Sequence, residues 1–291
     1  MHKPVLVSEV LEFLDPQNGE FFIDATAGAG GHTKAILEKL GKDGKIIAIE
    51  WNKHSADLLK SNLENTNNLE IICGNYADIP EIISEKKISQ VDGLLADLGF
   101  SSDELENSGR GFSFKKDEPL LMTYSDNSIP VYEILRKISE IELADIIRNF
   151  SNEKYAKRIA HAIKEEIKRN PHLSSLELAE VIKKSVPGNY EMRRINPATR
   201  TFQALRIYAN KELKNLEKLL LSLPKILQSG GRAVFISFHS LEDKLVKNYF
   251  RKYAKEKIAK ILTKKPVTVG SDELGQNIRS RSAKLRAIMF F

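Results

Sequence analysis

Short apolar runs alternate with amphipathic stretches over the first hundred residues of the chain. The apolar runs cover 21–25, 45–50, 69–73 and 91–98, and each has the length expected of a β-strand. The stretches between them, such as 34–40 and 54–62, mix polar and apolar positions as surface helices do. Strands that alternate with helices predict a parallel sheet covered by helices, here a Rossmann-like half-sheet.

The pattern becomes helical after a loop rich in Gly, Ser, Asp and Lys at about 101–130. Apolar residues recur at every fourth position, as one stripe of a helix does, at Tyr155, Ile159, Ile163 and Ile167. Ser174 with Glu177 predicts a capping box that opens a helix over 176–186. Asn196 and Pro197 predict the start of one long helix, with Pro224 as its end.

The strand pattern returns near the end of the chain. A break at Gly230 and Gly231 precedes a strand over 232–238, and Ser240 with Asp243 predicts a capping box for the next helix. Two further runs of strand-forming residues cover 266–269 and 284–291. We therefore expect one α/β domain, formed by 1–104 and 206–291, with an all-helical domain inserted at 105–205.

The composition is that of an ordinary soluble globular protein. The 291 residues are 42% hydrophobic and 29% charged, which is enough to bury a sizeable core. No apolar run reaches the ~20 residues that a membrane span needs, so we expect no membrane partner. Cys73 is the single cysteine and the first ten residues lack a signal-peptide pattern, which together predict a reducing, cytoplasmic location.

Charge is distributed unevenly along the chain. The net charge of +6 combines −9 over 1–104, +3 over 105–205 and +12 over 206–291. A strongly basic final part suggests a polyanionic partner such as a nucleic acid. A solvated, lysine-rich helical surface would give the same charge, and charge alone leaves both interpretations open.

A glycine-rich turn follows the first predicted strand. It contains Gly28, Gly30 and Gly31, and a helix begins near Thr33. Glycines there let the backbone pass close to a ligand. Glu50 ends the second strand, 20 residues after Gly30, where a carboxylate can accept hydrogen bonds from both hydroxyls of a ribose. The spacing predicts an adenosine-containing cofactor, although a plain tight connection between strand and helix would show the same glycines.

The turn departs from the dinucleotide-binding pattern G-x-G-x-x-G, which requires a glycine where the chain has Thr33. A nicotinamide-dependent dehydrogenase is therefore a distant alternative. The pattern D-x-x-x-G-x-G-G, which starts at Asp24, instead resembles the first motif of S-adenosylmethionine-dependent methyltransferases. His32 can face such a cofactor as a donor, and Tyr76 can stack on its adenine. A packed core or capping role is the alternative for each.

An acidic residue stands at the carboxyl end of the fourth predicted strand. Chemistry in Rossmann-like sheets gathers at the carboxyl ends of the strands, and Asp97 lies there. Because an idle carboxylate is costly to bury, Asp97 is the first candidate for contact with the methyl donor or an accepting amine. Asp92, five residues earlier, should lie at the opposite edge in a structural role. Methylation of pyrimidine carbon-5 uses a thiolate, and Cys73 ends the third strand rather than the fourth, which favours an amine or hydroxyl acceptor.

Longer stretches in chain order resemble one family, the bacterial 16S ribosomal RNA cytosine-N4 methyltransferases of the RsmH (MraW) type. The matching stretches are 2–6 (HKPVL), 24–32 (DATAGAGGH), 97–102 (DLGFSS), 110–114 (RGFSF), 197–207 (PATRTFQALRI), 237–243 (SFHSLED) and 281–286 (RSAKLR). Ungapped words such as PATRTFQALRI and SFHSLED are far more specific than a glycine turn. The stretches extend from one end of the chain to the other.

The resemblance implies a class I methyltransferase fold with an inserted helical domain, and S-adenosylmethionine as the methyl donor. The implied acceptor is the N4 amine of a decoding-centre cytidine in small-subunit (16S) ribosomal RNA, and no metal ion is expected. The implied cofactor contacts are Gly30, Gly31, His32, Glu50, Tyr76, Asp97 and Glu104. Three of them depart from the residues usual in the family, with Glu50 in place of Asp, Tyr76 in place of Phe and Glu104 in place of Gln.

Four residues are candidates for contact with the RNA. Guanidinium groups suit phosphate, so the resemblance favours Arg110, Arg200 and Arg206, although each can equally be a surface or ion-pair residue. His239 follows the fifth predicted strand and is a candidate for the pocket of the target base. The basic segment 251–265 is a candidate surface for the RNA backbone.

Some alternatives stay open at the level of sequence. The stretch 119–125 reads PLLMTYS where the family usually reads PLDMRMD, so a catalytically silent RNA-binding or ribosome-assembly factor is a second class of function. Methylation of another RNA amine is the alternative among enzymes. The sequence leaves the oligomeric state open, with a homodimer among the alternatives.

Overall fold

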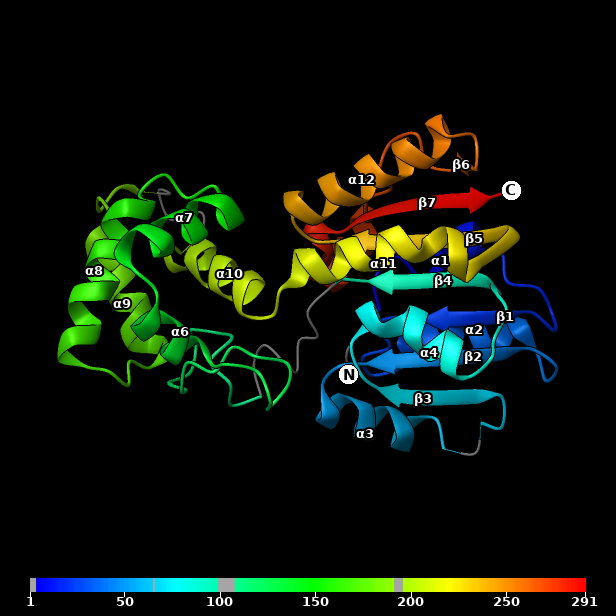
Figure 1. The fold of residues 1–291 in the computed structure, drawn as a ribbon, viewed down its shortest axis with the longest axis horizontal. Coiled ribbons are helices and arrows are strands. Elements are labelled where there is room, and N and C mark those ends of the chain that lie inside the picture. The colour runs from blue at the N-terminus through cyan, green and yellow to red at the C-terminus, as the bar shows by residue number, and fades with distance from the viewer. Residues whose placement is uncertain (1–3, 65, 99–107, 191–195) are drawn as a thin grey trace. The chain divides into compact units, whose positions relative to one another are not determined.

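The chain divides into two compact units in the computed structural model, which describes residues 4–64, 66–98, 108–190 and 196–291 (Figure 1). The first unit combines Met1–Gly99 with Leu213–Phe291, and the second comprises Phe100–Glu212. Among the described residues, no helix has the length and apolar character that crossing a bilayer requires.

A seven-stranded sheet forms the centre of the first unit. Its strands are β1 (Phe21–Asp24), β2 (Lys45–Glu50), β3 (Leu69–Cys73), β4 (Val91–Asp97), β5 (Leu227–Ser237), β6 (Ala259–Ile261) and β7 (Lys284–Phe290). They lie in the order β3-β2-β1-β4-β5-β7-β6. The first five strands run parallel, whereas β7 is antiparallel to β5 and β6 is antiparallel to β7. The predicted Rossmann-like α/β class is confirmed, and β1 to β5 all end at one edge, which we call the carboxyl edge.

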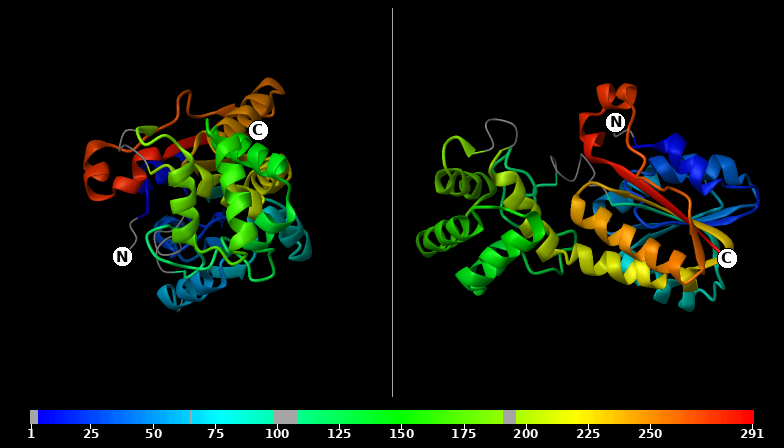
Figure 2. Two further views of the ribbon diagram at one scale, coloured as in Figure 1. Left: turned by 90° about the vertical axis from the view of Figure 1, so that its left-hand side faces the viewer. Right: turned by 90° about the horizontal axis from the view of Figure 1, so that it is seen from above.

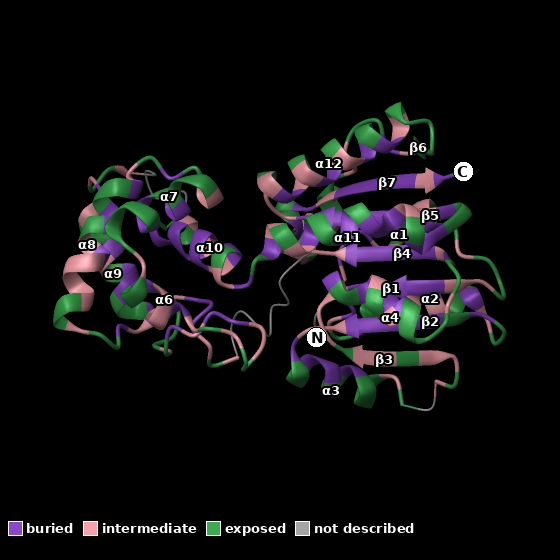
Figure 3. Ribbon diagram, in the orientation of Figure 1, coloured by how far each residue is buried: buried purple, intermediate pink, exposed green. Residues whose placement is uncertain are grey.

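Helices cover both faces of this sheet (Figure 2). The helical elements of the unit are α1 (Val7–Leu14), α2 (Gly31–Leu40), α3 (Lys53–Asn62), η1 (Tyr76–Asp78), α4 (Ile79–Glu85), α11 (Glu212–Ile226), α12 (Ser240–Lys255), α13 (Ser271–Gln276) and η3 (Ile278–Ser282). Successive strand side chains face opposite sides, so Leu94 packs with α4, α11 and α12 while Leu95 packs with α1 and α2. Burial on both faces explains why the central strands are apolar along most of their length (Figure 3).

Most strand predictions match the structure to within a residue or two, but the predicted strand at 266–269 is wrong. Only Val267 pairs there, in a single bridge to Leu285. Pro266 has no N–H to extend the pairing. The edge strand is β6 instead, a run of three residues in a lysine-rich segment whose sequence pattern does not predict a strand.

The second unit is helical and has its own core. Its helices are α6 (Val131–Lys137), α7 (Glu140–Ser151), α8 (Ala156–Arg169), α9 (Ser175–Ser185) and α10 (Ala198–Ala209). The predicted stripe faces the core of this unit, where Ile159 and Ile163 are inaccessible to solvent and Tyr155 and Ile167 are half-buried. The predicted capping box of α9 is confirmed, because Ser174 and Glu177 each accept from the other's backbone N–H.

The single long helix predicted between Pro197 and Pro224 is wrong, since α10 and α11 are separate helices. Asn210 follows α10 and its side chain donates to Met122 O at 2.8 Å, and Lys211 adopts a φ of 52°. Pro224 lies inside α11 rather than ending it. The Leu220 carbonyl, four residues earlier, cannot receive an N–H from Pro224 and accepts from the Tyr253 hydroxyl at 2.8 Å instead.

Candidate functional site

The turn between β1 and α2 is fixed by the buried carboxylate of Asp24. Its Oδ1 accepts from the Thr26 backbone N–H at 3.1 Å, and its Oδ2 accepts from the Thr33 hydroxyl at 2.6 Å. Burial raises the pKa of Asp24, while the Thr33 hydrogen bond and the charge of His32 act in the lowering direction. One carboxylate therefore ties both ends of the glycine turn to the end of β1.

The three glycines of the turn are needed for different reasons. A Cβ on Gly30, where φ is +89°, would lie 2.6 Å from Leu59 Cδ1, and a Cβ on Gly31 would lie 2.8 Å from Pro4 Cγ. Gly28 has a φ of +53°, and a Cβ there would meet no described atom within 4 Å. Packing thus explains Gly30 and Gly31, whereas Gly28 borders open space and leaves room for a ligand.

Glu50 lies at the end of β2, beside this turn. Its Oε2 accepts from the Gly28 backbone N–H at 2.9 Å, and its Oε1 accepts from the Asn52 backbone N–H at 2.7 Å. A carboxylate oxygen has more than one lone pair, so both oxygens can still accept from a ligand hydroxyl. The structure therefore brings the predicted ribose-binding carboxylate next to the open glycine.

Asp97 and His32 come together at the carboxyl edge. Asp97 ends β4, its side chain is 14% exposed, and its backbone N–H donates to Thr26 Oγ1 at 2.6 Å. His32 lies buried in the first turn of α2, with Nε2 3.5 Å from Asp97 Oδ2. That separation is the outer limit of a hydrogen bond, and neither ring nitrogen has a closer partner among the described residues. Nε2 thus faces Asp97, and Nδ1 is the buried ring nitrogen left for a polar ligand at this edge.

The charge of His32 depends on the carboxylates around it. Burial lowers the pKa of His32, but the hydrogen bond and charge of Asp97, with the charges of Asp24 and Glu273, outweigh burial and raise it. Glu273 lies in α13, and its Oε1 accepts from the Leu6 backbone N–H at 3.0 Å. No sequence pattern points to Glu273, because only folding brings α13 close to the glycine turn.

Tyr76, a predicted cofactor contact, and the single thiol, Cys73, lie at or just after the end of β3. Tyr76 is the first residue of η1, is half-buried and packs against the core on the face of the sheet that α4, α11 and α12 cover. Cys73 ends β3 and is exposed, and β2 and β1 lie between its strand and β4. Glu104 lies outside the described residues. Its cofactor contact stays a prediction, as does the stacking of Tyr76 on adenine.

Asp92 lies at the opposite edge of the sheet, as predicted. Its Oδ2 accepts from the Phe21 backbone N–H at 2.8 Å, and its Oδ1 accepts from Gln228. These bonds join the starts of β1, β4 and β5, so the role of Asp92 is structural.

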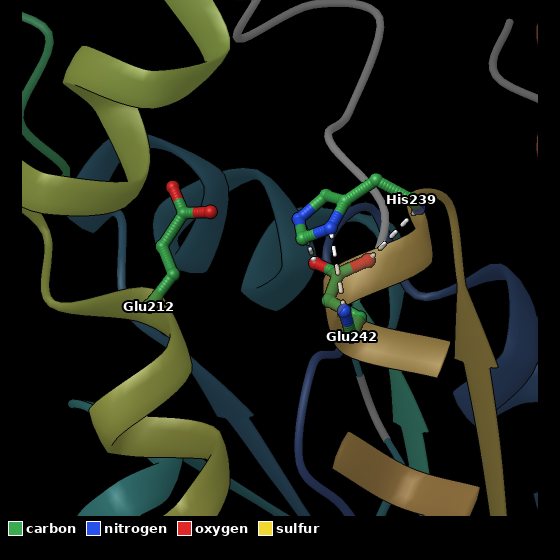
Figure 4. A group of neighbouring side chains, drawn as sticks. All are labelled: Glu212, His239 and Glu242. Carbon is green, nitrogen blue, oxygen red and sulfur yellow. Dashed lines mark hydrogen bonds and ion pairs between the residues drawn. The ribbon is translucent and has the colours of Figure 1, made fainter. Parts of the chain in front are cut away.

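His239 directly follows β5 and caps α12, so the predicted capping box of Ser240 and Asp243 is wrong. Its Nδ1 accepts from the Glu242 backbone N–H at 3.3 Å, and the Glu242 carboxylate accepts from backbone N–H groups 238 and 239. Glu242 Oε1 lies 3.1 Å from His239 Nε2 (Figure 4). The Asp243 carboxylate instead accepts from Arg286, with Oδ1 2.7 Å from Arg286 Nε. Because Nδ1 accepts, a neutral His239 carries its proton on Nε2, which faces the Glu242 carboxylate.

Arg110 is bound within the second unit. Its Nε donates to Thr123 O at 2.6 Å, its Nη2 donates to Thr123 Oγ1 at 2.8 Å, and its Nη1 lies 2.5 Å from Asp126 Oδ1. Tyr124 N–H in turn donates to Asn210 Oδ1 at 2.9 Å. Hydrogen bonds to Arg110 and Asn210 therefore hold the unusual 119–125 stretch in place.

The other two predicted arginines also have partners within their unit. Arg200 Nη1 donates to the Tyr190 hydroxyl at 2.7 Å and lies 3.7 Å from the buried carboxylate of Glu153. Arg206 binds Glu212 through two nitrogens, at 2.8 and 3.0 Å. These contacts favour the ion-pair interpretation, and RNA contact by the three arginines stays a prediction.

Comparison with known proteins gives one consistent result. Residues 1–290 match the MraW methylase family. The chain is 40% identical to the Ribosomal RNA small subunit methyltransferase H of Syntrophus aciditrophicus (strain SB), over 98% of this chain and 96% of the relative. It is 43% identical to the protein of the same name from Gloeothece citriformis (strain PCC 7424), over 98% of this chain and 93% of that relative.

Proposed function

Because the chain belongs to the MraW methylase family, we propose that it methylates the N4 amine of a decoding-centre cytidine in small-subunit ribosomal RNA. Family membership confirms the predicted resemblance and the predicted class, an S-adenosylmethionine-dependent methyltransferase. The relatives named as small-subunit rRNA methyltransferases support ribosomal RNA as the substrate. The cytoplasmic location stays a prediction from the sequence. The family also leaves the dehydrogenase alternative without support.

The residues at the carboxyl edge fit S-adenosylmethionine. Glu50 would hold the ribose hydroxyls beside Gly28, whose Cα borders open space. His32 has a buried Nδ1 without a hydrogen-bond partner among the described residues, and this atom would bind a polar group of the cofactor. Tyr76 would stack on adenine, and Asp97 would lie next to the reacting groups. When bound, the cofactor supplies a methyl group on a positively charged sulfur.

Asp97 is the residue that carries the proposal, since it ends β4 at the carboxyl edge with part of its carboxylate exposed. An exocyclic amine needs its lone pair aligned with the methyl group and an acceptor for its hydrogens. The Asp97 carboxylate can accept a hydrogen bond from such an amine. Thr26 fixes the backbone of Asp97, which holds the carboxylate in position.

The position of the thiol separates this chemistry from carbon-5 methylation. A carbon-5 enzyme needs a thiolate beside the target ring. The single thiol of the chain, Cys73, ends β3, and β2 and β1 lie between that strand and β4. The site therefore supports transfer to nitrogen rather than to ring carbon.

We propose that the inserted domain, 105–205, recognises the RNA. A base amine in structured RNA becomes accessible only when the cytidine is unstacked and enters the pocket. His239, which directly follows β5, is the first-unit residue proposed to line that pocket.

An activity assay tests the proposal. Purified protein, S-adenosylmethionine carrying a labelled methyl group and unmodified small ribosomal subunits should give labelled RNA, and Asp97→Ala should give none. Calorimetry on the wild type would support the silent RNA-binding alternative if S-adenosylmethionine failed to bind while RNA binding persisted.

A further inference from the structure

A continuous line of cations lies on α12 and the segment that follows it. Residues 244–265 contain nine basic residues and one acidic residue. We call the nine the cation strip: Lys244, Lys247, Arg251, Lys252, Lys255, Lys257, Lys260, Lys264 and Lys265. Eight are exposed and Lys247 is half-buried.

The strip lies in a stretch with a single carboxylate, whereas several exposed lysines elsewhere have carboxylate partners. Lys137 lies 2.9 Å from Glu133, and Lys218 lies 3.0 Å from Glu81. Within the described residues, no member of the strip forms an ion pair. Lys252 lies instead over the rings of Tyr249 and Tyr253, 5.9 Å from each centroid. Unpaired like charges repel one another, so the arrangement costs stability unless an anion is bound.

The helical part of the strip forms one face of α12. Lys244, Lys247, Arg251 and Lys255 recur at intervals of three and four residues, so their side chains project to the same side. The opposite side is occupied by the core, where Val246 and Phe250 are buried.

The sheet register shows where the strip begins and ends. Helix α12 starts next to His239 at the carboxyl edge and is about 24 Å long at 1.5 Å per residue. Beyond it, Lys260 pairs with Met289, which pairs with Arg232 near the opposite edge. The strip therefore leads from the candidate site to the far edge of the sheet.

We propose that the cation strip binds the phosphate backbone of the RNA that flanks the target nucleotide. The inference rests on the proposed function and adds a surface, outside the candidate site, that binds the substrate RNA. A lipid membrane is the less favoured anionic partner, because a helix that lies in a bilayer interface needs a free apolar face and the apolar face of α12 is in the core.

A triple variant, Lys247→Gln/Arg251→Gln/Lys255→Gln, tests the surface. The matched control is Lys39→Gln/Lys42→Gln/Lys45→Gln, three exposed lysines on α2 and at the start of β2. Binding to 16S RNA is measured by filter retention between 50 and 200 mM salt, and methylation of small subunits by kinetics. If all three cations bind phosphate, the slope of log K against log salt falls by about 2–3 and affinity drops on the order of tenfold to a hundredfold.

The expected pattern is a raised KM, an unchanged kcat and an unchanged Kd for S-adenosylmethionine in the strip variant, with wild-type behaviour in the control. An unchanged salt slope and KM in the strip variant would overturn the inference. The inference would also be overturned if the strip variant bound RNA like the wild type but no longer bound phosphatidylglycerol vesicles. If the wild type methylates no small subunit, the proposed function fails, yet the salt slopes still decide whether the strip binds RNA.

Discussion

Replacing single glycines of the β1–α2 turn by alanine separates packing from cofactor binding. Gly30→Ala introduces a Cβ 2.6 Å from Leu59 Cδ1 at a φ of +89°, and Leu59 is fully buried. A left-handed residue other than glycine costs about 1–2 kcal/mol, and overpacking costs a further ~1–3 kcal/mol. Gly28→Ala meets only the first cost, because its Cβ would enter open space. Gly30→Ala should therefore lower the free energy of unfolding by about 2–5 kcal/mol and Gly28→Ala by about 1–2 kcal/mol.

Cofactor affinity should follow the opposite order. The Cβ of Gly28→Ala projects into the space assigned to the ligand, so we expect at least about a tenfold rise in the Kd for S-adenosylmethionine, or ~1.4 kcal/mol. Folded Gly30→Ala protein should bind more nearly like the wild type. Urea unfolding gives the stabilities and calorimetry gives the two Kd values. Equal stabilities would refute the packing assignment of Gly30, and an unchanged Kd for Gly28→Ala would refute the assignment of the open side to the cofactor.

Three further predictions follow from the site and the second unit. Asp97→Ala should abolish methylation while circular dichroism and thermal unfolding stay near those of the wild type, and near-normal turnover would contradict the role of Asp97. The raised pKa of His32 means that its protonated form stabilises the fold fully below about pH 6.5 and that this contribution is lost as pH rises through the raised pKa. Urea titrations at several pH values give the difference in unfolding free energy between the wild type and His32→Gln. This difference should shrink above pH 6.5, and a difference that stays constant would contradict a raised pKa of His32. Arg110→Ala should cost about 2–3 kcal/mol of unfolding free energy because its hydrogen bonds to 123–126 are lost, whereas a surface arginine would cost under ~0.5 kcal/mol.

Local pattern predicts the central sheet well. The runs at 45–50 and 69–73 match β2 and β3 in both bounds. Strand β2 is buried over 46–49 and is therefore apolar on both faces, whereas β3 lies at one edge of the sheet and is recognised by its apolar residues and the polar turns that delimit it. The edge strand β6 escapes prediction because an edge strand with one buried face and several lysines looks like a polar loop.

Long-range contacts account for the other differences. The break between α10 and α11 depends on Asn210 bonding to Met122, 88 residues away in sequence. Pro224 remains inside α11 because Tyr253 supplies the hydrogen bond that proline cannot. Neither partner can be inferred from helical periodicity.

The candidate site divides in the same way. The turn, Glu50 and Asp97 follow from strand ends and spacing, since parallel strands of one sheet end at a common edge. Glu273 and Glu242 were not predicted as part of the site, and the pairing of Arg110, Arg200 and Arg206 depends on carboxylates that only the folded unit brings near.

Nucleoside analysis of the methylated RNA identifies the atom that receives the methyl group. Small subunits methylated by the purified protein are digested to nucleosides and the labelled product is identified by mass spectrometry. We expect the labelled nucleoside to be N4-methylcytidine, derived from a single cytidine, with no label on ring carbon. Label in 5-methylcytidine, in a ribose methyl group or in another base would contradict the assignment of the Asp97 site to a cytidine amine.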